Sequence, residues 1–212
     1  MKLTRFGHSC VRIEGPGGVI VIDPGDLSDD ACLDGADAIL ITHEHFDHFS
    51  QSRIRSAVEA NRGLTVWSVA AVAELLAGLP RIHTIGHGAS FTAAGFDIEA
   101  HGTWHAQIHS DVPRVMNTGF LVEGQLFHPG DALTIPDKPV DTLLLPVHAA
   151  WSRTSDLIDW VREIAPYRTV GVHDGALNRV GVAIMDGLLG NHGPGIGSIY
   201  SPVAPYGSID DI

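Results

Sequence analysis

Residues 41–50 read ITHEHFDHFS and place three histidines and two acids within six consecutive positions. This cluster follows the apolar run 38–41, which is too short and too uniformly apolar for an amphipathic helix and therefore predicts a buried strand. Two interpretations are open for so many ionisable groups at a strand end. The cluster is either a solvated turn that is rich in histidine or one part of a metal site, and the rest of the chain discriminates between them.

The same arrangement recurs along the chain, because further strand-like segments end in a side chain that can bind a metal. A rigid strand followed by a loop can aim such a side chain into a shared pocket. Histidine nitrogen and aspartate oxygen are ligands that zinc and similar cations take. The candidates outside the first cluster are His105 after IEAHGTW, Asp131 after QLFHPG, His148 after TLLLPV and His173 after RTVGV.

The spacing inside the first cluster also suits metal binding. His43 and His45 are separated by one residue, so an extended segment places both rings on one side. Asp47 and His48 follow after a turn and can face a neighbouring position. The pattern differs from the helical HExxH of zinc proteases, which requires histidines at i and i+4.

The composition describes an ordinary globular chain. Its 212 residues suffice for one substantial core and are marginal for two, so we expect a single domain over 1–212. Apolar residues make up 44% and charged residues 18%. No apolar run approaches the roughly 18–20 residues of a membrane span, and the N-terminus lacks the apolar core of a signal peptide. We therefore expect a cytoplasmic protein with no membrane partner.

The charge and the cysteines exclude further classes. The formal net charge of −12 makes nucleic acid an unsuitable partner, although carboxylates that bind a divalent cation would be neutralised in the folded protein. Cys10 and Cys32 do not make a disulfide framework and lack a CxxC neighbour, so we interpret them as small apolar side chains. The 13 histidines are an excess that motivates a search for ligands.

Turn residues divide the chain into strands and helices. Two halves each begin with a hairpin and then alternate strands with helices, which predicts two β-sheets covered by helices in one α/β sandwich. Predicted strands span 9–15, 18–25, 36–41, 64–69, 81–86, 90–95, 96–105, 140–147 and 168–174, with a hairpin over 119–131 that turns at Glu123 and Gly124. Predicted helices span 50–63, 70–79, 154–166 and 178–190, and we expect 191–212 to be irregular.

The motif over 42–48 and further segments of the chain resemble those of a known family. THEHFDH is similar to the HxHxDH motif of the metallo-β-lactamase-fold hydrolases, and the order of the further segments matches over nearly the whole chain. These segments are VIVIDPG, GTWH, FHPGD and GVHDG. The resemblance implies an αββα sandwich of two mixed β-sheets flanked by helices, with the metals at one edge of the sheets. GHSCVRIEG, NTGFLVEGQLFHPGD and LLLPVHAAW resemble most the ascorbate-6-phosphate-lactonase-like branch.

The resemblance also implies a ligand set and a reaction. It assigns His43, His45 and His105 to one metal, assigns Asp47, His48 and His173 to a second, and makes Asp131 the bridge. The cofactors would be two divalent ions, zinc or else manganese or iron, about 3.5–4 Å apart and sharing a hydroxide. This hydroxide would attack an ester, lactone, amide or phosphodiester bond of a small-molecule substrate.

Several residues are predicted to support the centre. Asp47 would also hold or deprotonate the water, and Asp23 would fix the ligand loop from behind. His148 is either a substrate contact or proton donor or an ordinary histidine at the pocket edge. His8 and Asn117 match segments of the lactonase-like branch, yet each could serve only to satisfy backbone groups.

Other polar and aromatic residues have competing interpretations. His101 and His109 compete with His105 for the third ligand position, which the family pattern gives to His105. His109 and Asp111 could also reach the cleft. We expect a structural role for His128, a solvated Glu44, and surface or loop positions for His83, His87 and His192. Trp104 and Trp151 could wall a pocket, although core packing is the default for aromatic residues.

Two rival functions remain. Some members of the superfamily are iron-dependent oxidoreductases, although the di-iron reductases carry Glu at the position of His45 and a fused flavin domain, both of which are absent here. Iron-dependent dioxygenase chemistry is not excluded by the ligands alone. The other rival is a metal-binding protein without turnover. The sequence allows a homo-oligomer, and it does not name the substrate.

Overall fold

The apolar segments of the first half form one mixed sheet. In this computed structural model, which describes residues 1–190, 193–202 and 206–212, the strand order is β14-β1-β2-β3-β4-β5-β6. The neighbours β1, β2 and β3 are antiparallel, whereas β3 to β6 run parallel. The bounds are β1 Lys2–Arg5, β2 Val11–Gly15, β3 Gly18–Ile22, β4 Ala38–Ile41, β5 Thr65–Ser68, β6 Ile82–Thr84 and β14 Ser208–Ile209.

The second half forms a matching sheet with the order β13-β12-β11-β10-β9-β8-β7. The pairs β7–β8, β8–β9 and β9–β10 are antiparallel, whereas the pairs β10–β11, β11–β12 and β12–β13 are parallel. The bounds are β7 Ser90–Ala93, β8 Phe96–His101, β9 Gly119–Val122, β10 Leu126–His128, β11 Thr142–Pro146, β12 Arg168–Val172 and β13 Ile199–Ser201. The helices are α1 Gln51–Ala60, α2 Ala70–Leu75, α3 Thr154–Ile164 and α4 Arg179–Leu189, with a 3₁₀ turn at Asp30–Leu33.

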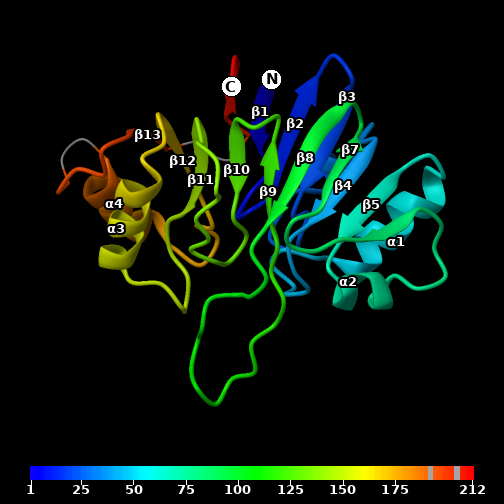
Figure 1. Cartoon of the computed structure of the whole chain (residues 1–212), viewed down its shortest axis with the longest axis horizontal. Coiled ribbons are helices and arrows are strands. Elements are labelled where there is room, and N and C mark those ends of the chain that lie inside the picture. The colour runs from blue at the N-terminus through cyan, green and yellow to red at the C-terminus, as the bar shows by residue number, and fades with distance from the viewer. Residues whose placement is uncertain (191–192, 203–205) are drawn as a thin grey trace.

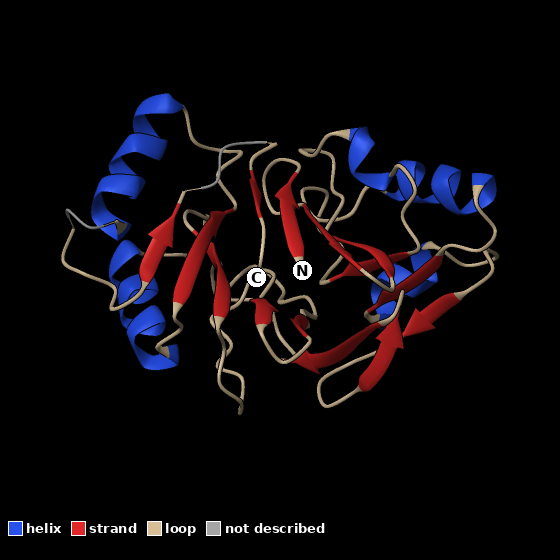
Figure 2. Ribbon diagram, turned by 90° about the horizontal axis from the view of Figure 1, so that it is seen from above, coloured by secondary structure: helices blue, strands red, loops and turns tan. Residues whose placement is uncertain are grey.

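Alternation of side chains along the buried strands builds the layers. In β4, Leu40 faces the core between the two sheets, whereas Ile39 and Ile41 pack towards α1 and α2. In β11, Leu144 faces the inner core, whereas Leu143 and Leu145 pack towards α3 and α4. Strands that are apolar on both faces are therefore covered on both sides, as the uniform apolar runs predict. Figure 2 shows the two sheets between the two helix pairs, which confirms the αββα sandwich.

The helices have recognisable boundaries. The buried stripe of α3 includes Leu157 and Val161, and the helix stops at Ala165, whose φ of 52° is followed by Pro166. Asn178 caps α4, because its Oδ1 accepts hydrogen bonds of 3.0 and 2.9 Å from the N–H groups of Val180 and Gly181.

The topology gathers the predicted ligand loops at one edge. The carboxyl ends of neighbouring parallel strands lie at the same edge of a sheet, and the segments after β3, β4, β11 and β12 carry candidate residues. Figure 1 shows the connection between β8 and β9, coloured green, as a long loop that projects beyond this edge. His105 lies near the start of that loop, after the turn at Gly102, whose φ is 87°.

Several boundaries predicted from the sequence are wrong. β8 ends at His101, so the strand expected to reach His105 is shorter, because Gly102 turns the chain away from the sheet. β1 was not predicted, and the expected irregular tail contributes β13 and β14. These three short strands form because other strands offer hydrogen bonds at the sheet edges, which local sequence does not reveal. His192 lies outside the described residues.

No helix in the described segments combines the length and the hydrophobicity that a bilayer span requires.

Candidate metal centre

The ligand loop after β4 is tied to the buried side chain of Asp23. Oδ1 of Asp23 accepts a hydrogen bond of 2.8 Å from the backbone N–H of Thr42. Its Oδ2 accepts bonds from Thr42 Oγ1 at 2.8 Å and from His48 Nδ1 at 2.7 Å. One carboxylate therefore holds both the strand end and the last histidine of the loop, an arrangement that suits the supporting position predicted for Asp23.

Four histidines bond to the protein through Nδ1 and present Nε2 to the centre. An Nδ1–H group that donates to an oxygen leaves Nε2 of a neutral ring with its lone pair. The Nδ1 contacts are His43 with Thr42 Oγ1 at 2.9 Å, His48 with Asp23 Oδ2 at 2.7 Å, His105 with the Ala106 carbonyl at 2.6 Å and His173 with the His148 carbonyl at 2.6 Å. The protein thus orients these rings before any ligand binds.

The candidate ligand atoms form adjoining groups, in each of which all atoms lie within 4.8 Å of one another. His43, His45 and His105 make one group, and Nε2 of His43 lies 3.1 Å from Nδ1 of His45. A second group consists of His8, Asp47, His48 and His173. A third group consists of His43, His48 and Asp131. The structure therefore brings together all seven ligands expected from the sequence, and His8 lies among them.

Asp131 lies between His105, expected to bind one metal, and His48 and His173, expected to bind the other. Its Oδ1 lies 3.1 Å from Nε2 of His48 and 3.1 Å from Nε2 of His173. Its Oδ2 lies 3.4 Å from Nε2 of His105. One oxygen therefore faces each side of the cluster, which is the arrangement that a bridging carboxylate requires.

Buried side-chain nitrogen and oxygen atoms without a hydrogen-bond partner indicate whether this cluster suits a metal. Nε2 of His48, His105 and His173 and Oδ1 of Asp131 are all buried without a hydrogen-bond partner. Buried polar atoms in native proteins are normally satisfied, and a group of unsatisfied ones requires an explanation such as an ion. Four such atoms converge here, and nitrogen with carboxylate oxygen is the donor set of zinc-type cations. The residues present therefore fit divalent metals.

The histidines differ in their electrostatic surroundings. Burial lowers the pKa of His43 well below its ordinary value, so this ring is neutral and can act as a ligand. Burial opposes the charge of His48 as well, yet the carboxylates of Asp131 and Asp23 outweigh it and raise the pKa of His48 well above its ordinary value. In the metal-free protein, His48 consequently holds a proton that a metal must displace.

The carboxylates are ionised. Burial alone would raise the pKa of Asp47, but the hydrogen bond from His8 and the nearby charge of His48 lower it to about 2. Burial also works against the charge of Asp131, and the neighbouring histidines, His48 first among them, hold the pKa of Asp131 well below its ordinary value. Both side chains can therefore bind cations throughout the neutral range.

His8 supports Asp47. Its φ is 46°, and its buried ring accepts a hydrogen bond of 3.0 Å at Nδ1 from the N–H of Gly175. Nε2 lies 3.1 Å from Oδ2 of Asp47, and burial lowers the pKa of His8, so the neutral ring donates this bond. His8 therefore orients Asp47 and also lies beside His173, with ring centroids 3.9 Å apart.

Asn117 supports the loop of Asp131. Its Oδ1 accepts a hydrogen bond of 2.9 Å from the N–H of Asp131, and its Nδ2 donates one of 2.9 Å to the carbonyl of Pro129. Gly130 between them has a φ of 62°, and a Cβ there would lie 2.3 Å from Oδ1 of Asn117. The side chain of Asn117 is fully buried, so its contacts place it behind the site.

Other candidates lie away from the cluster. His101, at the end of β8, faces Asp137 and Glu99 at 3.7 and 3.9 Å. His109 is 64% exposed on the projecting loop and lies 3.6 Å from Asp111. The structure therefore brings His105, and neither of its two rivals, to the other ligands, and it does not place His109 or Asp111 in the cleft.

Two further histidines differ in position. The backbone carbonyl of His148 accepts the hydrogen bond from Nδ1 of His173. His148 itself is half-buried and follows Val147, just after the end of β11. His128 is buried, and its Nε2 donates a hydrogen bond of 2.9 Å to the carbonyl of Ser9. This contact agrees with the structural role expected for His128.

Core packing is wrong for both tryptophans, and Glu44 is less solvated than expected. Trp151 is only half-buried, and its indole Nε1 donates a hydrogen bond of 2.8 Å to Oδ2 of Asp131. Trp104, beside His105, is 50% exposed rather than part of the core. Glu44 is half-buried, and its Oε2 is buried without a partner. Only the proximity of the two tryptophans to His105 and His148 in the sequence hinted at the site.

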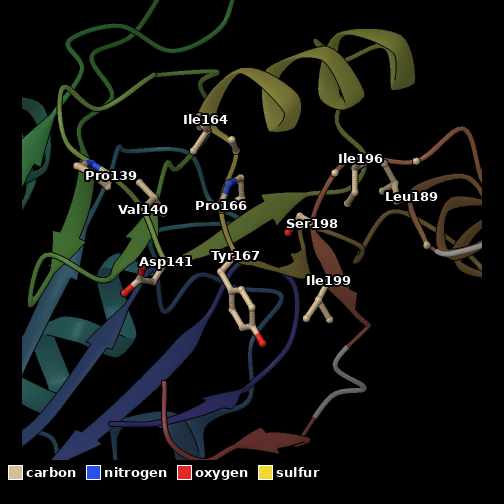
Figure 3. A pocket seen from close by; sticks show the side chains of 14 residues that line it. Pro139, Val140, Asp141, Ile164, Pro166, Tyr167, Leu189, Ile196, Ser198 and Ile199 are labelled. Atoms are coloured by element: carbon tan, nitrogen blue, oxygen red, sulfur yellow. The ribbon is translucent and has the colours of Figure 1, made fainter.

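A cavity elsewhere does not reach these residues. A hollow of about 820 Å³ is lined by Val140, Pro166, Tyr167 and Ile199 among others. Figure 3 labels these residues. Its residues precede β11 and β12, whereas the candidate ligands follow these parallel strands. The hollow therefore lies at the opposite end of the second sheet.

The comparison with known families decides the assignment of the fold. The model of a beta-lactamase superfamily domain matches residues 2–173 of this chain. The chain belongs to the beta-lactamase superfamily. A superfamily relative from Mycobacterium tuberculosis is 35% identical over 179 residues, which cover 82% of this chain and 84% of that protein.

Other similar proteins carry descriptive names. A protein named UPF0173 metal-dependent hydrolase from Shouchella clausii is 30% identical over 172 residues, which cover 69% of this chain and 73% of that protein. A crystal structure described as a metal-dependent hydrolase from Parabacteroides distasonis has a TM-score of 0.74 at 22% identity, covering 94% of this chain and 91% of that one. The family predicted from the sequence is confirmed, whereas the narrower resemblance to ascorbate-6-phosphate lactonases stays a prediction.

Proposed function

We propose that this chain is a metal-dependent hydrolase with a binuclear centre, formed by His43, His45 and His105 on one side and by Asp47, His48 and His173 on the other, with Asp131 between them. The observation that carries the proposal is the convergence of the Nε2 atoms of His48 and His173 on Oδ1 of Asp131, each at 3.1 Å. The hydrolase names of relatives support it. Two divalent cations, zinc by preference, would supply a water of lowered pKa and polarise the oxygen of the scissile bond.

The residues of the chain have distinct roles in this proposal. Asp47, whose pKa is about 2, is a carboxylate at neutral pH and can accept a proton or a hydrogen bond from the nucleophilic water. His8 orients Asp47, and Asp23 fixes His48, so both carry out supporting roles. The half-buried His148 follows β11 and is the proposed proton donor to the leaving group. The scissile bond would be that of an ester, lactone, amide or phosphodiester.

Metal content and activity measured on the same samples test the proposal. His43→Ala and Asp131→Ala should each lose metal by elemental analysis and lose hydrolysis of generic esters, lactones and phosphodiesters. His83→Ala is the control, because His83 lies in β6 stacked on Trp67 at 4.1 Å and contacts no candidate ligand. Full metal content in both site variants would refute the ligand assignment. A fully metal-loaded wild type that hydrolyses none of these substrates would refute the hydrolase.

A further inference from the structure

The surroundings of the candidate centre are poor in positive charge. The segments that carry the ligands and their neighbours contain neither lysine nor arginine. These segments are 24–29, 42–48, 102–113, 129–136, 147–152 and 173–178. A substrate with phosphate or carboxylate groups beyond the reacting centre would normally meet Arg or Lys side chains, which bind such groups in pairs of hydrogen bonds or as point charges.

The nearest arginines are engaged with the protein. Arg5 is buried, forms an ion pair with Asp174, and lies with its guanidinium 3.4 Å from the carbonyl of His8. Arg114 donates from Nε to the carbonyl of His105 at 3.0 Å, and its guanidinium lies 5.8 Å from the ring centre of Trp104. Arg153 pairs with Asp156 at 3.0 Å. Arg5 and Arg153 therefore pair with carboxylates of the protein, and Arg114 lies against His105 and Trp104.

The same segments carry large apolar side chains instead. We call Leu27, Phe46, Trp104 and Trp151 the apolar rim. Phe46 is 63% exposed although it lies between the candidate ligands His45 and Asp47. Its carbonyl accepts a hydrogen bond of 2.7 Å from the N–H of Asp26, which ties the ligand loop to the segment that carries Leu27.

The other members of the apolar rim also adjoin candidate ligands or their supports. A Cβ built on Gly175 would lie 3.1 Å from Cδ1 of Leu27 and 2.7 Å from Nδ1 of His8, so Leu27 lies beside the support of Asp47. Trp104 precedes His105 in the chain and pairs with Met116 across the base of the projecting loop. The ring of Trp151 lies 6.2 Å from the ring of His105.

We infer that the substrate has no charged group near its scissile bond and carries an apolar acyl or aryl group. This apolar group packs on the apolar rim while the scissile bond of the substrate lies at Asp131. This inference rests on the proposed hydrolase function and narrows it to neutral esters, lactones or amides. Exposed apolar surface is unfavourable in water, and a bound apolar group would cover it. Each added CH₂ that becomes buried should raise kcat/KM by up to about fourfold until the rim is filled.

A series of matched esters tests the inference on the metal-loaded protein. p-Nitrophenyl acetate, butyrate and hexanoate share a leaving group and differ in apolar length, and mono-p-nitrophenyl glutarate adds a terminal carboxylate. We expect kcat/KM to rise from acetate to hexanoate and to fall at least tenfold from hexanoate to the glutarate ester. Bis(p-nitrophenyl) phosphate should be a poorer substrate than hexanoate. A flat or falling length dependence, or a preference for either anionic substrate, would overturn the inference and leave the hydrolase intact.

Variants and a binding measurement separate this inference from the proposed function. Phe46→Ala should flatten the length dependence without loss of metal, whereas Ile184→Ala should not, because Ile184 is 55% exposed on α4 and belongs neither to the apolar rim nor to the groups of candidate ligands. Tryptophan fluorescence would report binding of hexananilide, a stable neutral amide, and of its 4-carboxy derivative. If no ester is hydrolysed but the neutral amide binds more tightly and depends on Phe46, the hydrolase fails and the ligand class stands. Equal or tighter binding of the carboxylate would refute the ligand class.

Discussion

The indole Nε1 of Trp151 donates a hydrogen bond of 2.8 Å to Oδ2 of Asp131. An indole N–H can only donate, so it fixes one oxygen of the carboxylate and leaves Oδ1 between His48 and His173. The loop after β11 thereby controls the orientation of a side chain that follows β10.

Trp151→Phe should weaken metal binding, because it keeps an aromatic ring and removes the N–H that orients Asp131. Loss of a contact behind a metal ligand typically costs about 10–100-fold in affinity or activity. Competition with a chelator would measure the affinity. The matched control is Trp160→Phe, since Trp160 donates its N–H to the carbonyl of Thr134 and lies on the buried face of α3. Equal affinities in wild type and Trp151→Phe would contradict the orienting role.

Metal uptake should release a proton from His48. Burial opposes its charge, but Asp131 and Asp23 raise the pKa of His48 well above its ordinary value of 6.5, so the ring is charged at pH 7 without metal. Metal affinity should therefore decrease as the pH falls. Calorimetric titrations in two buffers of different ionisation enthalpy would count the released protons. No dependence of the measured heat on the buffer would show that His48 is already neutral.

The raised pKa of His48 also predicts how the stability of the metal-free protein depends on pH. A pKa that is higher in the folded than in the unfolded state contributes stability that is complete below about pH 6.5 and is lost as the pH rises through the folded value. The Tm of the metal-free protein should thus fall as the pH rises above about 6.5, and the metal-loaded protein should lack this contribution. A His48→Asn variant, which cannot titrate, serves as the control.

Gly25→Ala should disrupt the ligand loop. A Cβ at Gly25 would lie 2.1 Å from the carbonyl oxygen of Asp47, so the loop must move and the metal should be lost. Gly187→Ala is the contrasting variant, because Gly187 lies in α4 with open space around it, and it should stabilise the fold by about 0.5–1 kcal/mol. Chemical denaturation and elemental analysis would measure both effects. Full metal content in Gly25→Ala would contradict the close approach.

His148→Gln should lower kcat without lowering metal content, because the half-buried ring follows β11 while only the backbone carbonyl contacts His173. Loss of a general acid typically reduces the rate by about 10²–10⁴-fold. An unchanged kcat for a substrate with a poor leaving group would show that His148 is an ordinary residue at the pocket edge.

The sequence by itself determined the layers and the ligand loops. Strands such as β4 and β11 are uniformly apolar, which predicts burial on both faces, and each is followed by a candidate ligand. The motif over 43–48 and the later segments in matching order were enough to predict the family, which the family comparison confirms. These features are readable because periodicity and strand ends are local properties of the chain.

Only the tertiary structure decided which side chains from distant segments meet. His101 and His105 have similar surroundings in the sequence, but the turn at Gly102 separates them and sends only His105 to Asp131. Trp151 and Asp131 are 20 residues apart, and β13 and β14 exist because neighbouring strands pair with them. Hydrogen bonds between distant segments depend on the packing of two sheets, so no local pattern encodes which partners meet.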